Sequence, residues 1–177
     1  MATAVPAAAP RILLLQGPNM SYLGQRQPEL YGTTTAAELD HLVLQHAQSR
    51  GADLRIHYTH LEGEAIATIY RAVEDGVQGL VMNPAGFTYG GFALRDCLLA
   101  VPIPYIEVHM TNIEKRGTTS VTAVAAVGVI AGFGVSSYLL GIDALLELVV
   151  APVPIAYAEQ FFVSGPFSVT VTRDYGQ

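Results

Sequence analysis

Short apolar runs alternate with amphipathic stretches along most of the chain. Residues 12–15 are four aliphatic residues without polar alternation, which is typical of a strand covered on both faces. Further strands are predicted at 54–58, 80–82 and 105–108, and helices at 35–50, 66–73, 92–99 and, as one long glycine-rich helix, 122–148. The alternation of strand and helix predicts an α/β fold with a parallel sheet and right-handed crossovers.

Polar residues follow three of the predicted strands. Asn19, Asn83 and His109 come after apolar runs, and ligands in open α/β sheets bind beyond the carboxyl ends of the strands. Glu107 lies two residues before His109, so both side chains point to the same side of an extended strand. The carboxylate can then orient the imidazole, which favours a proton-transfer role for His109 over a purely structural one.

Length and composition narrow the function classes. A chain of 177 residues suits one domain, and 51% hydrophobic residues with a mean hydropathy of +0.37 suggest apolar surface hidden between subunits. A formal charge of −6 without a basic block argues against nucleic acid or an anionic membrane as partner. The stretch 121–140 has no charge, but its glycine, serine and threonine content favours a buried or subunit-facing helix over a membrane span.

Cysteine and histidine usage argues against a zinc site and favours a reducing compartment. Cys97 is the single cysteine, so no intrachain disulfide is possible and a cytoplasmic location is expected. The histidines are scattered without HxxxH or CxxC spacing, which argues against a zinc site. Residues 1–10 lack the pattern of a secretion signal and are predicted to be a flexible tail.

Several ordered motifs resemble those of type II 3-dehydroquinate dehydratases. The opening of that family is matched by Gly17-Pro18-Asn19, Leu23-Gly24, Arg26, Pro28-Glu29 and Tyr31-Gly32. The later motifs are Glu62-Gly63-Glu64, Asn83-Pro84, Ala93-Leu94-Arg95-Asp96 and Glu107-Val108-His109. The likeness covers residues 11–148, and it leaves 149–177 as a C-terminal extension in which 167–172 alternates like a strand.

The resemblance implies a flavodoxin-like three-layer sandwich that works without metal or organic cofactor, in a homo-oligomer that is a trimer-based dodecamer. It implies a hydro-lyase in which Tyr31, activated by Arg26, removes a proton next to a ketone. Asn19 helps to hold the resulting enolate through water, and His109, backed by Glu107, protonates the departing hydroxyl. Substrate binding would fall to Asn83, to the backbone amides of Met110 and Thr111, and, for the neighbouring subunit's site, to Asp96.

The pairing of a tyrosine base with an arginine agrees with the acid–base chemistry of the two side chains. A free tyrosine has a pKa of about 10 and is a poor base at neutral pH unless a cation lies beside it. Arginine keeps its positive charge at any working pH and can serve as this cation.

Some positions depart from the family pattern. Thr88-Tyr89 stands where a Thr-His pair is usual, Gln16 replaces an asparagine, and the segment 114–120 is shorter than the basic segment that reaches the substrate's hydroxyls. A site that loses hydroxyl partners loses discrimination, and Tyr89 would add apolar surface at its mouth. The substrate is therefore expected to be 3-dehydroquinate or a less hydroxylated or bulkier ketone.

Two other functions stay open on the sequence. The scaffold could catalyse cyclisation or isomerisation of an apolar, polyketide-like intermediate in specialised metabolism, or it could be a non-catalytic binding protein, because a fold can host unrelated activities.

Overall fold

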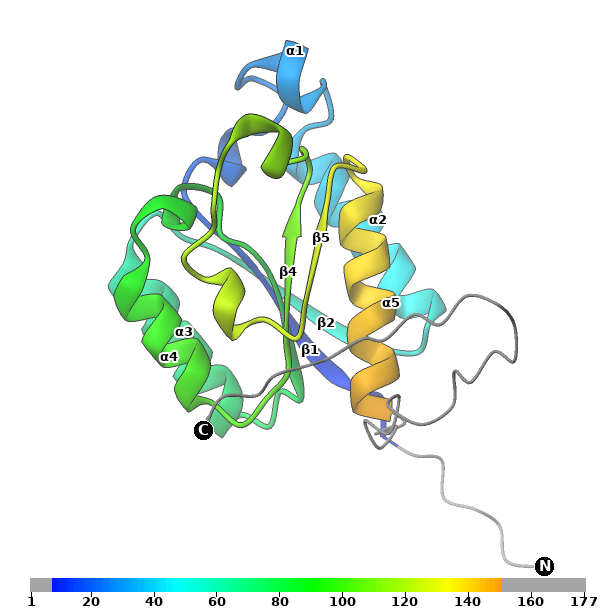
Figure 1. Cartoon of the computed structure of the whole chain (residues 1–177). Helices are drawn as coiled ribbons and strands as arrows, with labels where there is room; N and C mark the ends of the chain where they lie inside the picture. Colours follow the sequence, from blue (N-terminus) through cyan, green and yellow to red (C-terminus); the bar gives the residue numbers. More distant parts are fainter. Residues whose placement is uncertain (1–7, 151–177) are drawn as a thin grey trace, which may run out of the picture.

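A parallel sheet lies between two pairs of helices in the computed structural model, which describes residues 8–150 (Figure 1). The strands are β1 (Arg11–Gln16), β2 (Asp53–Tyr58), β3 (Gly79–Asn83), β4 (Tyr105–His109) and β5 (Gly128–Ala131). The α-helices are α1 (Pro28–Tyr31), α2 (Ala36–Ser49), α3 (Glu62–Glu74), α4 (Phe92–Ala100) and α5 (Ser136–Val150). Single 3₁₀ turns form η1 (Met20–Tyr22), η2 (Ala85–Tyr89), η3 (Glu114–Arg116) and η4 (Ala123–Ala125).

The sheet order is β2-β1-β3-β4-β5, with every neighbouring pair parallel. The chain leaves β1 toward one edge to form β2 and returns past β1 to form β3. The switch in strand order therefore lies between β1 and β3, where Gln16 pairs with Asn83. A ligand site is expected beyond the carboxyl ends of these two strands. The predicted flavodoxin-like α/β fold is confirmed.

Both faces of the sheet are covered, which explains the unbroken apolar run in β1. Ile12 and Leu14 belong to the core under α2 and α5, whereas Leu13 and Leu15 belong to the core under α3 and α4 (Figure 1). All four side chains are at most 4% exposed. A strand with one solvated face would have required polar residues at alternate positions.

The helix predicted at 35–50 is observed as α2, and its start follows from a capping box. Thr35 accepts a hydrogen bond from the Glu38 amide at 3.2 Å, and the Glu38 carboxylate accepts one from the Thr35 amide at 2.8 Å. Two amides of the first turn that lack helical partners are satisfied in this way.

The prediction of one helix over 122–148 is wrong. The segment contains the edge strand β5, which pairs with β4, and the helix α5 begins only at Ser136. Gly132 and Gly134 have φ values of 100° and 57°, in the left-handed region that favours glycine. These glycines turn the chain between strand and helix, whereas the sequence prediction placed them inside one helix.

The remaining fold predictions concern the Tyr31 segment, membrane spans, the C-terminal extension and the assembly. The loop that carries Tyr31 ends in the one-turn helix α1 rather than being irregular throughout. Helices long and apolar enough for a membrane span are absent from residues 8–150. The alternating segment 167–172 lies outside the described residues. The predicted domain limits and dodecamer stay predictions.

Close packing of α5 on the sheet yields a stability prediction. A Cβ atom added at Gly141 would lie 2.6 Å from Cγ1 of Val108, so Gly141→Ala should destabilise the protein by about 1–2 kcal/mol although alanine is the better helix former. Gly63→Ala in α3 is the matched control, because its Cβ would meet nothing within 4 Å. Chemical denaturation measures both. Equal stability of the two variants would contradict this account of the α5 packing.

Candidate active site

A cavity of about 60 Å³ opens at the carboxyl ends of β1, β3 and β4. Its lining comprises Met20, Arg26, Tyr31, Asn83, Ala85, Gly86, Thr88, Tyr89, His109, Met110, Thr111, Ile113, Arg116 and Thr118. The predicted base and the predicted acid, Tyr31 and His109, thus share one cavity. A wider hollow of about 570 Å³ beside the first turns of α2 contains none of the predicted site residues.

The loop that carries Tyr31 can move at little cost. None of residues 25–32 is buried, so opening the loop would break few apolar contacts. Outward displacement of this loop would widen the cavity, and a loop that closes over a substrate also excludes water from the reaction.

Two arginines approach Tyr31 from different directions. The guanidinium carbon of Arg26 lies 5.1 Å from the ring centroid of Tyr31, which is a cation–π contact. Arg116 instead approaches the phenol oxygen, to which its Nη1 donates at 3.4 Å, and it also donates to Oγ1 of Thr111 at 3.0 Å. Of the two arginines, Arg116 is the one that donates a hydrogen bond to the phenol oxygen, the atom predicted to act as the base.

The role of Arg116 is not evident from the sequence, where this residue is only part of a shortened loop. The sequence feature that could have identified Arg116 is its position as a basic residue in the loop after β4, seven residues beyond His109. Arg116 comes back to the cavity because η3 and a hydrogen bond from the Thr118 amide to the Ile113 carbonyl fold the loop back. The hydrophobic pattern of the sequence does not predict such a fold.

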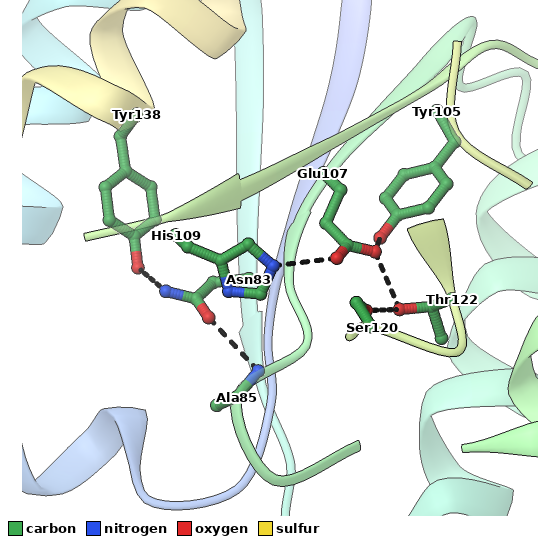
Figure 2. A network of polar contacts seen from close by, with 8 residues as sticks. All are labelled: Asn83, Ala85, Tyr105, Glu107, His109, Ser120, Thr122 and Tyr138. Atoms are coloured by element: carbon green, nitrogen blue, oxygen red, sulfur yellow. Dashed lines mark hydrogen bonds and ion pairs between the residues drawn. The ribbon is translucent and has the colours of Figure 1, made fainter. Parts of the chain in front are cut away.

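His109 is held by a buried carboxylate (Figure 2). Because a carboxylate can only accept, Nε2–H of His109 donates to Oε1 of Glu107, at 2.7 Å. Glu107 is 0% exposed, and its other oxygen accepts from the hydroxyls of Tyr105 at 2.6 Å and Thr122 at 2.7 Å. The orientation of the imidazole is thus fixed, and Nδ1 is the ring nitrogen not engaged by Glu107.

Burial and hydrogen bonding act in opposite directions on the pKa of Glu107. Burial raises the pKa of this carboxyl, but the hydrogen bonds it accepts, that from His109 first, outweigh burial and hold the pKa below its ordinary value. Glu107 therefore stays anionic at neutral pH and accepts the hydrogen bond from Nε2–H of His109.

The remaining predicted residues separate into two groups. Asn83, Tyr89, Met110 and Thr111 line the cavity. Two others lie outside the cavity lining. Asn19 is exposed, and its main-chain N–H donates to Nδ1 of His60 at 3.2 Å. Asp96 is exposed on α4 and pairs with Arg95 at 2.8 Å. The parts assigned to Asn19 through water and to Asp96 in a neighbouring subunit stay predictions.

The cavity lining contains groups that can bind an anion and exchange protons. Across residues 8–150, no three or more His, Cys, Asp or Glu side chains gather in a way that could hold a metal ion. The lining supplies two phenols, an imidazole and two guanidinium groups. Such a set binds an anion and moves protons at neutral pH.

Comparison with known proteins decides the family. The model of the family described as dehydroquinase class II matches residues 10–146. The chain belongs to this family. The family members most similar to it include the 3-dehydroquinate dehydratase of Ectopseudomonas mendocina, 44% identical over 77% of this chain and 94% of that protein. The 3-dehydroquinate dehydratase of Carboxydothermus hydrogenoformans is 42% identical over 77% of this chain and 90% of that protein.

A solved class II dehydroquinase has the same fold. The type II dehydroquinase of Butyrivibrio crossotus superposes with a TM-score of 0.75 at 32% identity, covering 77% of this chain and 97% of that one. The resemblance predicted from the motifs is confirmed, and so is the predicted enzyme class, because the relatives bear the name of a hydro-lyase.

Proposed function

We propose that this class II dehydroquinase removes water from 3-dehydroquinate through an enolate, with Tyr31 as the base and His109 as the acid. The observation that carries the proposal is the common cavity of these two side chains, with Arg116 at the phenol oxygen and Glu107 behind the imidazole. The relatives that bear the name 3-dehydroquinate dehydratase support the same substrate.

Each side chain has one task in the reaction. The Tyr31 oxygen takes the proton from the carbon next to the ketone, and the electron pair of that bond forms the enolate. Collapse of the enolate expels the β-hydroxyl, which takes a proton from His109 and leaves as water. The hydrogen bond from Nε2–H to Glu107 holds the imidazole in position before and after this proton transfer, and the nearby guanidinium favours the phenolate.

The charge of the lining separates this function from its rivals. Arg26, Arg116 and His109 line the cavity, and no carboxylate of residues 8–150 does, so an anionic ketone fits better than an apolar polyketide-like intermediate. Met20, Met110 and Ile113 add apolar surface, which leaves room for a less hydroxylated relative of the substrate. A purely binding protein would not need the buried carboxylate behind His109.

A direct assay tests the proposal. Purified protein mixed with 3-dehydroquinate should produce the absorbance of a conjugated enone, because dehydration places a carbon–carbon double bond beside the carbonyl. Substrate without protein is the control. Constant absorbance with folded protein would overturn the proposed substrate and favour a ketone that lacks some of its hydroxyls.

A further inference from the structure

The side-chain amide of Asn83 is oriented from within the protein. Asn83 is only 4% exposed, and Oδ1 accepts a hydrogen bond from the Ala85 amide at 3.1 Å. A main-chain N–H can only donate, so the atom near Ala85 must be the oxygen. The Nδ2 group then faces the hydroxyl of Tyr138, to which it donates at 2.8 Å (Figure 2).

Tyr138 continues this chain of hydrogen bonds into the core. It is 0% exposed on α5, and its hydroxyl, which accepts from Asn83, donates to Oε1 of Gln16 at 3.0 Å. Burial raises the pKa of Tyr138 well above the ordinary value, so the hydroxyl keeps the proton that it donates. Each hydrogen bond in the series Ala85, Asn83, Tyr138, Gln16 therefore has a defined donor and a defined acceptor.

Gln16 shows that this series is not arranged for stability alone. Its side chain is 0% exposed, and Nε2 has no hydrogen-bond partner within the described part of the chain. A buried donor without a partner is unfavourable. The series runs across the carboxyl ends of β1 and β3 and ends at Asn83, in the lining of the cavity.

We infer that Tyr138 is a positioning residue, which acts through Asn83 on substrate binding. With one Nδ2 hydrogen bound to Tyr138 and Oδ1 bound to Ala85, the second Nδ2 hydrogen is the donor that Asn83 has left for an oxygen of the substrate. Loss of the Tyr138 hydroxyl removes the hydrogen-bond acceptor that holds Nδ2 of Asn83 in place. The inference rests on the proposed dehydration for its kinetic test but not for its structural one.

Kinetics of Tyr138→Phe on 3-dehydroquinate measure the effect. We expect KM to rise about tenfold, the size of one hydrogen bond, with a smaller fall in kcat, because Asn83 binds the substrate and takes no part in the proton transfers. Asn83→Ala should raise KM by at least as much, and adding Tyr138→Phe to it should have no further effect. Effects that multiply in the double variant would mean that Tyr138 acts elsewhere, and they would overturn the inference.

The matched control is Ser137→Ala. Ser137 precedes Tyr138 on α5 and is also 0% exposed, but its hydroxyl oxygen accepts a hydrogen bond from the Phe133 amide at 3.1 Å, and Ser137 does not line the cavity. We expect wild-type KM for this variant. A similar rise in KM in both variants would indicate general loosening of the fold and contradict a specific role for Tyr138.

Exchange of the Asn83 side-chain amide hydrogens gives a readout that needs no turnover. These NMR signals are identified by their absence in Asn83→Ala. They should exchange slowly in the wild type and in Ser137→Ala, and faster in Tyr138→Phe. Unchanged exchange in Tyr138→Phe would overturn the inference even if the enzyme is active. An inactive wild type would instead refute the proposed function, and the exchange data would still decide whether Tyr138 orients Asn83.

Discussion

Tyr31→Phe is expected to lower kcat by about 10³-fold, which is within the range for loss of a general base. The substitution removes the phenol oxygen that accepts the proton and leaves the ring on which Arg26 stacks. Tyr31 is only partly buried, and the bond from Arg116 is long at 3.4 Å, so removal of the hydroxyl should cost little stability. The thermal midpoint and the assembly should match those of the wild type.

Tyr22→Phe is the control for this experiment. Tyr22 belongs to the same loop after β1, but it is 62% exposed and does not line the cavity. Steady-state rates of both variants on 3-dehydroquinate separate loss of the base from a general effect on the loop. A Tyr31→Phe enzyme with near wild-type kcat would show that another group removes the proton.

The positions of Asn83 and His109 were predictable from the ends of their strands, whereas Asn19, three residues beyond the end of β1, does not line the cavity. The apolar runs of β1, β3 and β4 determine which residues leave the sheet on the same side, so Asn83 and His109 could be placed near one another without coordinates. The pairing of Glu107 with His109 follows from the two-residue repeat of a strand.

Features that depend on tertiary contacts were not predictable in the same way. Strand β5 is four residues long, and its pairing with β4 outweighs an apolar pattern that also suits a helix. Arg116 reaches Tyr31 only because η3 turns its loop back over the cavity. The link from Asn83 through Tyr138 to Gln16 joins residues 122 positions apart and has no local signal.

Removal of the imidazole should separate catalysis from stability at the acid site. Both His109→Ala and His109→Gln should lower kcat by about 10³-fold, because neither side chain can protonate the departing hydroxyl. Glutamine can still donate to Glu107, whereas alanine leaves one carboxylate oxygen without its closest partner. His109→Ala should therefore lose about 3 kcal/mol of stability, the lower range for breaking a buried pair, and His109→Gln much less.

The pH dependence of unfolding adds a check with a definite sign. The folded-state pKa of Glu107 is held below its ordinary value, so this carboxylate stabilises the fold above its unfolded pKa, and that stability is lost as the pH falls through the folded pKa. Without the donor at position 109 the folded pKa rises, and acid unfolding of His109→Ala should begin at a higher pH than that of the wild type or His109→Gln. Circular dichroism during acid titration measures it. If His109→Ala unfolds like the wild type and keeps its activity on the true substrate, then the ion pair is dispensable, and the scaffold performs a reaction that needs no acid at this position.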